Sequence, residues 1–225
     1  MKKVISVFIL LVFLFQIVSA QNTQKTNLSL QVSAAATANR TELAGYVWTR
    51  TVTIYEGAEL KLTNVSSMSL GADGKLMTSV VSSTPAKLPK SGIFGDKDRK
   101  KLKELQTYVD EAVAEAQGYI YLSKGKMVDF FDKATITPEA NSFKVAGTNV
   151  NKTGDQLTMN ITKKTMAYIS QSFKSNLSNN DPISGMLNYK TFNNGLTAID
   201  NGNLLLQAKN LKLQVTNSNY AKKMK

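Results

Sequence analysis

The chain has 225 residues and a formal net charge of +12 at pH 7, from 28 Lys and Arg against 16 Asp and Glu. It contains no cysteine and no histidine, which excludes Ser-His-Asp and Cys-His catalysis, metal sites built on thiolate or imidazole ligands, and disulfides that would hold the fold together. Its hydrophobic content of 42% is that of a globular protein, so we expect a packed core, no catalytic residues, no metal site and no cofactor.

The first twenty residues predict export from the cytoplasm. Lys2 and Lys3 form a positive n-region, residues 4–15 form an apolar run, and Val18 and Ala20 are the small residues that a signal peptidase requires. The run is shorter than the roughly 20 apolar residues of a spanning helix, which favours cleavage after Ala20 over an uncleaved membrane anchor. No cysteine follows the leader, so we expect no lipid anchor and place the mature chain in the periplasm or outside the cell.

The mature chain begins with a helix and three strands. Residues 22–45 predict a polar start followed by a helix that ends at Gly45. The aromatic and β-branched residues of 46–56 predict a strand, and residues 58–70 and 75–82 predict two more. The connections between these strands are too short for parallel crossovers, so we expect an antiparallel meander.

Two helices and six further strands follow. Residues 83–98 break the strand pattern, residues 97–117 place apolar side chains at helical spacing, and residues 124–133 predict a shorter helix. Alternation then returns in six segments: 142–148, 156–162, 165–174, 184–192, 196–206 and 211–220. No linker flanks the helices, so we predict one α+β domain over residues 21–225. It would consist of a predominantly antiparallel sheet of about nine strands, an N-terminal helix and a helical insertion at about 97–133.

Three short segments accompany this order of elements: Tyr46-Val47-Trp48, Gly71-Ala72-Asp73-Gly74-Lys75 and Asn219-Tyr220. These segments resemble uncharacterised secreted bacterial proteins with the same layout. The order of elements itself resembles the half-barrel of the periplasmic lipoprotein-carrier (LolA-like) superfamily, which includes mycobacterial lipid-binding lipoproteins. The resemblance implies a strongly curved sheet around an apolar concavity, with helices that cover its mouth. The strand arginine that helps to close the carrier's lid has no motif-level match here, so the resemblance does not extend to lipoprotein transport itself.

Arg50 is the first candidate ligand-binding residue. On the first predicted strand it shares a face with Trp48, Val52 and Ile54, so we expect its guanidinium to point into an apolar concavity. A buried guanidinium must be paired, and an anionic ligand head or a lid carbonyl would serve. The alternatives are that this face is exposed to solvent, or that a carboxylate such as Glu56 pairs with Arg50.

The shorter predicted helix carries the second candidate, an apolar stripe of Met127, Phe130 and Phe131. Such a stripe would form a lid over an apolar ligand, since methionine adapts to varied partners. The alternative is ordinary packing of the helix on the sheet. On the same helix Asp129 and Asp132 are spaced like a carboxylate pair, but without further acidic ligands we interpret them as a solvated face.

A basic segment with an apolar tip is the third candidate. Its predicted docking residues are Lys90, Ile93, Phe94, Lys97, Arg99 and Lys100. An Ile-Phe tip on a glycine-flanked loop inside a basic cluster is suited to docking at an anionic membrane surface. The alternative is a connector whose two apolar side chains enter the core while its lysines stay solvated.

From these observations we predict an exported, monomeric, non-enzymatic binding protein for a hydrophobic or lipid-like molecule, with a carrier as its most specific form. All basic residues except Arg40, Arg50 and Arg99 are lysines, so the charge favours an anionic membrane surface or envelope polymer over nucleic acid. The alternative is a structural or interaction module of the cell envelope that binds an anionic polymer or a protein. An enzyme would instead need converging carboxylates of perturbed pKa in a cleft.

Overall fold

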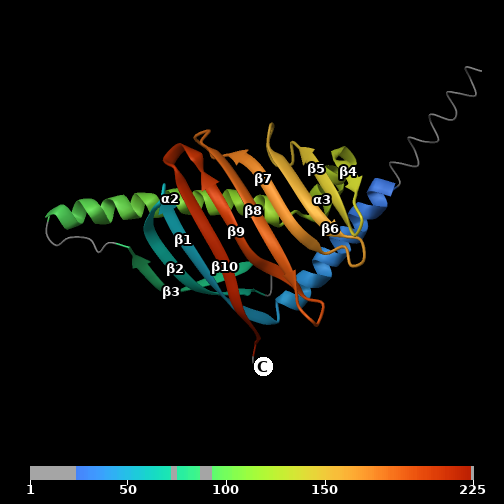
Figure 1. The fold of residues 1–225 in the computed structure, drawn as a ribbon, viewed down its shortest axis with the longest axis horizontal. Coiled ribbons are helices and arrows are strands. Elements are labelled where there is room, and N and C mark those ends of the chain that lie inside the picture. The colour runs from blue at the N-terminus through green and yellow to red at the C-terminus, as the bar shows by residue number, and fades with distance from the viewer. Residues whose placement is uncertain (1–23, 72–74, 87–92, 224–225) are drawn as a thin grey trace, which may run out of the picture.

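The computed structural model describes residues 24–71, 75–86 and 93–223. Its strands form one antiparallel sheet of 10 strands, in the order β3-β2-β1-β10-β9-β8-β7-β6-β5-β4 (Figure 1). The strands are β1 (Tyr46–Glu56), β2 (Glu59–Leu70), β3 (Leu76–Pro85), β4 (Thr135–Pro138), β5 (Ser142–Thr148), β6 (Gln156–Thr162), β7 (Tyr168–Asn176), β8 (Pro182–Thr191), β9 (Thr197–Leu206) and β10 (Leu211–Lys222).

The first strand of the chain pairs with the last one. β1 lies between β2 and β10, and its register with β10 places Arg50 opposite Asn217. The register shifts between Val47 and Thr49, beside Asn219 of β10, whose φ is 53°. This pairing joins the first three strands to the last seven, so that residues from both ends of the chain form one wall.

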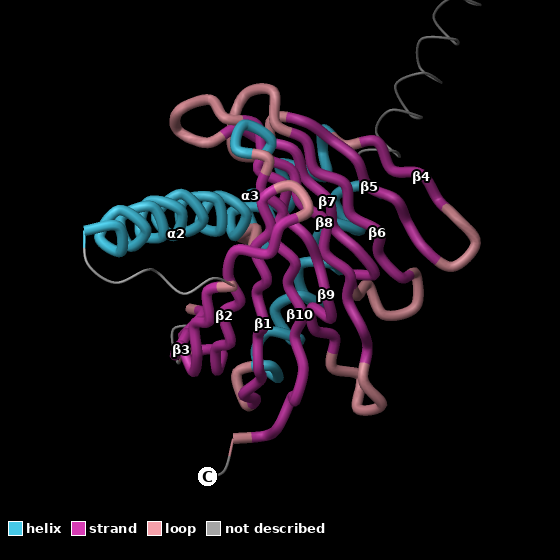
Figure 2. The backbone as a smooth tube through the Cα atoms, turned by 60° about the vertical axis from the view of Figure 1, so that its left-hand side comes forward, coloured by secondary structure: helices cyan, strands magenta, loops and turns pink. Residues whose placement is uncertain are grey.

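Three α-helices of the described residues lie on one face of the sheet: residues 24–43, α2 (Ile93–Ile120) and α3 (Lys124–Lys133). Figures 1 and 2 show them behind the strands of a twisted, curved sheet, with the first part of α2 extending past its edge. The core forms between this helical layer and alternate strand residues. In β6, for example, Leu157, Met159 and Ile161 are buried and the residues between them are only half-buried.

The apolar side chains of α3 pack directly into the core. Met127, Phe130 and Phe131 are all buried, and the two phenylalanine rings meet edge to face with centroids 5.8 Å apart. The Phe130 ring lies so close to β5 that a Cβ added at Gly147 would come within 2.9 Å of it. Ser123 caps the start of the helix by accepting a hydrogen bond from the backbone amide three residues later.

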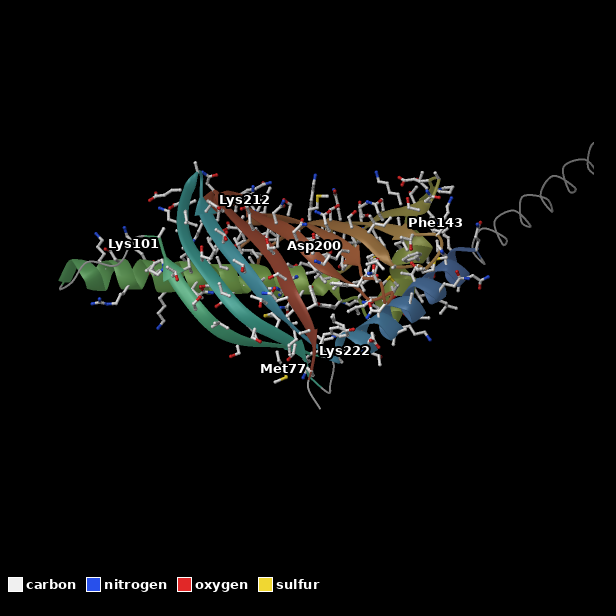
Figure 3. The ribbon with its side chains drawn as sticks, turned by 60° about the horizontal axis from the view of Figure 1, so that its bottom comes forward. Met77, Lys101, Phe143, Asp200, Lys212 and Lys222 are labelled. Carbon is white, nitrogen blue, oxygen red and sulfur yellow. The ribbon has the colours of Figure 1, made fainter. Side chains whose placement is uncertain are left out.

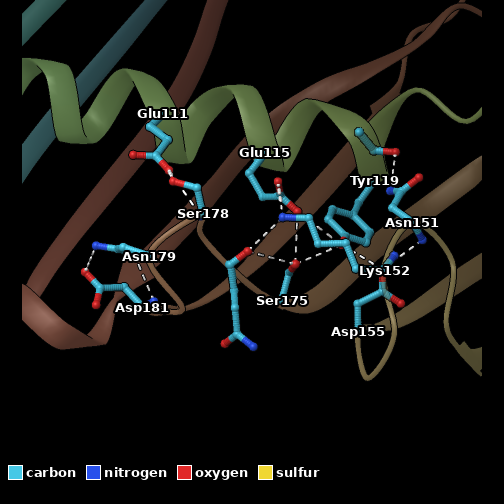
Figure 4. A network of polar contacts seen from close by, with 12 residues as sticks. Glu111, Glu115, Tyr119, Asn151, Lys152, Asp155, Ser175, Ser178, Asn179 and Asp181 are labelled. Carbon is cyan, nitrogen blue, oxygen red and sulfur yellow. Dashed lines mark hydrogen bonds and ion pairs between the residues drawn. The ribbon is translucent and has the colours of Figure 1, made fainter.

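A buried polar network fastens α2 to the sheet (Figure 4). The hydroxyl of Tyr119 donates to Oδ2 of Asp155 at 2.7 Å and lies 2.9 Å from Oγ of Ser175. Asp155 also accepts hydrogen bonds from the backbone amides of residues 150, 151 and 152. Burial raises the pKa of Asp155, but these amides and the Tyr119 hydroxyl outweigh burial and hold it below its usual value. A charged acceptor with this many donors anchors the helix at one position.

Two more contacts along α2 continue this attachment. Glu111 accepts hydrogen bonds from the amide and the hydroxyl of Ser178, and the hydroxyl of Tyr108 donates to Asp181 at 2.7 Å. Burial and the Asp181 carboxylate raise the pKa of Tyr108 to about 12. The second half of α2 is therefore attached through side chains of the β5–β6 and β7–β8 connections, whereas its first part extends past the edge of the sheet (Figure 1).

The structure confirms the α+β class and the antiparallel sheet with an N-terminal helix and a central helical insertion. The sheet has 10 strands where about nine were expected. The additional strand is β4, which has only 4 residues and ends on Pro138, so it is too short for alternation to be recognised. α2 begins at Ile93, so the predicted apolar loop is helical from that residue. The predicted leader and Lys90 lie outside the described residues, and within the described ranges no helix is long and apolar enough to cross a membrane.

Candidate functional site

A cavity of about 580 Å³ lies between the N-terminal helix and one end of the sheet. At this end β1 and β7 begin and β8 and β10 end, because neighbouring strands are antiparallel. The aromatic and charged side chains that line the cavity include Trp48, Arg50, Tyr121, Tyr168, Tyr189 and Tyr220. Met127 of α3 and Met166, before β7, also contribute to the lining.

The N-terminal helix keeps the cavity open because its side chains there are small. The lining stretch 33–38 contains only serine, threonine and alanine. On one side of this stretch the amide of Asn39 exchanges two hydrogen bonds with the backbone of Thr197, at 2.6 and 2.7 Å. On the other side Nζ of Lys25 donates to the carbonyl of Ala134 at 2.8 Å. The helix is thus held at both ends, and larger side chains between them would fill the space.

Arg50 is the charged group on the β1 wall of the cavity. Its Nε donates to Oδ1 of Asn217 at 2.9 Å, and Nδ2 of Asn217 donates to the carbonyl of Ile199 at 3.0 Å. Burial lowers the pKa of Arg50, and electrostatic interaction with Tyr121 and Tyr220 partly offsets this. An arginine side chain nevertheless remains protonated at physiological pH, so the cavity wall carries a positive charge.

The guanidinium of Arg50 has no carboxylate partner among the described residues. Glu56, expected as an alternative partner, pairs with Lys61 at 2.9 Å. Glu42, the one acidic residue in the cavity lining, is exposed and forms no ion pair with Arg50. Within the described part of the chain, the two terminal nitrogens of Arg50 have no hydrogen-bond partner. A partly desolvated charge in this state favours the binding of an anion.

Trp48 lies two residues before Arg50 and contributes a second polar hydrogen. Its ring stacks on Tyr220 with centroids 5.6 Å apart and an interplanar angle of 16°. The indole Nε1 is buried and has no acceptor among the described residues. The wall formed by β1 and β10 therefore holds two side chains with donors that no described residue satisfies.

Four tyrosines make the rest of this lining aromatic. The rings of Tyr168 and Tyr189 lie 5.5 Å apart, and the hydroxyl of Tyr189 donates to Oε1 of Gln171. The hydroxyl of Tyr220 donates to the carbonyl of Ile199 at 2.7 Å. Burial raises the pKa of all four hydroxyls, those of Tyr121, Tyr168, Tyr189 and Tyr220. They are therefore neutral at physiological pH, and their rings offer apolar surface with polar edges.

The structure brings three of the predicted ligand-binding residues to the cavity: Trp48, Arg50 and Met127. The other four belong to the main core, where Ile54, Phe130 and Phe131 are buried and Val52 packs against them. Packing of α3 on the sheet therefore accounts for both phenylalanines, and only Met127 of the predicted stripe lines this cavity.

Apart from Lys90, which lies outside the described residues, the predicted docking residues lie on α2 and not on a loop. Lys97, Arg99 and Lys100 are exposed on the first part of α2, and Figure 3 shows the adjacent Lys101 on the projecting end of that helix. Ile93 and Phe94 are the first two residues of α2, and their side chains lie outside the described part of the structure.

Other candidate sites are weaker. A second hollow of about 980 Å³ lies between the start of the N-terminal helix and β4, but its Lys25 already donates to the carbonyls of Asp132 and Ala134 at the end of α3. Asp129 and Asp132 gain no further acidic neighbours, and the described residues contain no group of three or more carboxylates that could hold a metal ion.

Sequence analysis missed the tyrosines and Asn217. Tyr121 directly follows α2, Tyr168 opens β7, and Tyr189 and Tyr220 lie near the ends of β8 and β10. In an antiparallel meander the start of one strand meets the end of the next, so these positions fall at the same end of the sheet. The sequence signal that could have identified these tyrosines is the presence of aromatic residues at the strand ends that meet on one side of the sheet.

No protein-family model matches the chain, and no curated protein is similar to it in sequence. Among solved structures, a DUF1329 family protein from Desulfovibrio piger matches with a TM-score of 0.41 and 9% identity, over 90% of this chain and 93% of its own. A domain from Vibrio parahaemolyticus, described as belonging to an outer membrane lipoprotein-sorting protein, matches with a TM-score of 0.36 and 8% identity, over 85% and 92%. A LolA superfamily protein from Nitrosomonas europaea matches with a TM-score of 0.35 and 9% identity, over 88% and 94%.

The second description names a lipoprotein-sorting protein, and the third names the LolA superfamily. At TM-scores of 0.35 to 0.41 the similarities say nothing about the ligand of this chain, which has to be inferred from the cavity itself.

Proposed function

We propose that the protein is an exported binding protein that holds a hydrophobic or amphipathic molecule beneath its N-terminal helix. The observation that carries this proposal is the cavity of about 580 Å³, a size typical of small-molecule sites, which measure about 300–1,000 Å³. Aromatic rings, methionines, leucines and alanines line it together with Arg50 and other polar side chains, a mixture that suits an amphipathic ligand. Burial of the ligand's apolar surface, worth about 25 cal/mol per Å², would supply most of the affinity.

A carrier is the most specific form of this function. Lys97, Arg99 and Lys100 are exposed on the projecting part of α2, where they favour approach to an anionic membrane surface. Each basic residue near such a surface contributes about 1 kcal/mol, and the attraction weakens with salt. The predicted leader would deliver the protein to the envelope, where it would meet membrane lipids.

The test is to recover the full protein after export, extract it with organic solvent and identify bound molecules by mass spectrometry. Ala36→Phe places a large ring in the cavity, because Ala36 is a lining residue. Ala34→Phe is the matched control, since Ala34 is exposed on the same helix and does not line the cavity. We expect an amphiphile with the wild type and the control but not with Ala36→Phe. Absence of any amphiphile from the wild type, or equal amounts from all three proteins, would contradict the proposal.

A structural or interaction module is the second candidate, and the edge strand β3 favours it. β3 lies at one end of the strand order, and its Met77, Val80 and Val81 are 58%, 65% and 68% exposed. Edge strands without charge or cover are available for pairing with another chain. This function predicts binding to an envelope protein or polysaccharide that Ala36→Phe leaves unchanged, which a pull-down at low and high salt would measure.

A further inference from the structure

We propose, within the function proposed above, that Arg50 makes the cavity selective for amphiphiles whose head is a carboxylate or a phosphate group. Arg50 lines the cavity, and its two terminal nitrogens have no hydrogen-bond partner among the described residues. An uncharged head would leave the guanidinium charge without a counter-ion in a partly desolvated site, whereas an anionic head would neutralise it and accept hydrogen bonds from both nitrogens.

The cross-strand partner of Arg50 orients the guanidinium for such a head. Asn217 is 2% exposed, lies opposite Arg50 in the register, and is itself held by the carbonyl of Ile199. It occupies Nε of Arg50, which leaves the edge with both terminal nitrogens available. A carboxylate or phosphate accepts two parallel hydrogen bonds from that edge, and a side chain already held in place loses little entropy on binding.

The surroundings of Arg50 supply no competing anion. Glu42 is the one acidic lining residue and is exposed, while the other ionised lining residues, Arg40 and Lys124, are basic. Arg40 stacks over the ring of Tyr121, 5.0 Å from its centroid. The cavity therefore has an excess of positive charge, which disfavours cationic heads and favours anionic ones.

The remaining lining selects the body of the ligand. Met127, Met166 and Leu196 join the tyrosine rings in the cavity wall, and the stretch 33–38 adds small side chains. A small free anion would leave this apolar surface uncovered. Arg50 is the ionised lining residue that is half-buried, whereas Arg40, Glu42 and Lys124 are exposed. Its position beside these apolar side chains matches a chain-like amphiphile with a single charged end.

The experiment is isothermal titration calorimetry of the full protein with four ligands that share one alkyl chain: dodecanoate, dodecyl phosphate, dodecanol and methyl dodecanoate, each below micelle formation. We expect the wild type to bind at least one of the two anions about tenfold or more tightly than the neutral ligands. In Arg50→Met this ratio should fall to about one, with the affinity for dodecanol retained. Lys144→Met, which removes one exposed charge from β5 outside the cavity lining, is the matched control and should keep the wild-type ratio.

Each outcome tests either the selectivity assigned to Arg50 or the proposed binding function. A preference for one anion over the other supports the proposal and identifies the head group. Equal affinity of the wild type for anionic and neutral ligands overturns the selectivity but leaves the proposed function standing. Failure of all four ligands to bind overturns the proposed function as well. An anion preference that survives in Arg50→Met overturns the role of Arg50. If Arg50→Met does not fold, Arg50→Lys replaces it, because lysine keeps the positive charge without the two-nitrogen edge.

Discussion

Replacing Arg50 with methionine should make the ligand-free protein more stable. The change removes one hydrogen bond to Oδ1 of Asn217, worth about 1 kcal/mol. It also removes a half-buried guanidinium that no described carboxylate pairs with. Desolvation of a buried ion costs several kcal/mol, and we take roughly half of that for a half-buried side chain. The net expectation is a gain of about 1–2 kcal/mol in the free energy of unfolding, as often seen when a binding residue is replaced by an apolar one.

Urea unfolding followed by circular dichroism measures this difference, with and without ligand. Dodecanoate at about 100 times its dissociation constant should stabilise the wild type by about 2.7 kcal/mol, and the same concentration should stabilise Arg50→Met much less. If the affinity of the variant is tenfold weaker, its stabilisation is smaller by about 1.3 kcal/mol, so dodecanoate should largely cancel the stability advantage of Arg50→Met. A loss of more than about 1 kcal/mol in the ligand-free variant would refute the reasoning, because it exceeds the single hydrogen bond to Asn217 and would make Arg50 a structural residue.

Three predictions concern the attachment of α2. Tyr119→Phe removes the donor to the ionised Asp155 and should lower the free energy of unfolding by about 1.5–3 kcal/mol in urea titrations; a change below about 0.5 kcal/mol would argue against the network. Folding lowers the pKa of Asp155, so its contribution to stability is complete above the unfolded-state pKa of about 3.9 and is lost as pH falls through the folded-state pKa. The free energy of unfolding, measured from pH 6 to 2, should therefore fall more steeply in the wild type than in Asp155→Asn. Gly185→Ala should lower the free energy of unfolding by about 1–3 kcal/mol, because a Cβ there would overlap the Phe173 ring that stacks on Tyr119. An unchanged melting temperature would show that the ring can move aside.

Most of the fold could be predicted because its signals are local. Alternation of Leu157, Met159 and Ile161 with half-buried residues specifies β6, and apolar positions at helical spacing specify the buried face of α2. The pairing of β1 with β10 could not be predicted, because it depends on which of several compatible strands meet after the insertion has folded. The short β4, which ends on Pro138, has too few residues for a periodic pattern.

Only the site residues that lie on the same strand could be predicted to lie together. Trp48 and Arg50 are two residues apart, and period-two alternation places them on one face. Asn217 and Tyr220 reach the same wall only through the β1–β10 register, so no local pattern could connect them with Arg50. Phe130 and Phe131 were interpreted as part of a lid over a cavity, whereas they lie in the core. The sequence could not distinguish the two, because an apolar helix face has the same spacing in a lid and in a packed core.

The most direct test of the binding function is ligand titration followed by tryptophan fluorescence. Trp48 is the single tryptophan of the chain and lines the cavity, so its emission reports on this site alone. On titration with dodecanoate we predict a saturable change in the emission of the wild type at one ligand per protein, retained in Ala34→Phe and lost in Ala36→Phe. Unchanged Trp48 emission, while calorimetry detects dodecanoate binding, would place the ligand elsewhere and contradict the account.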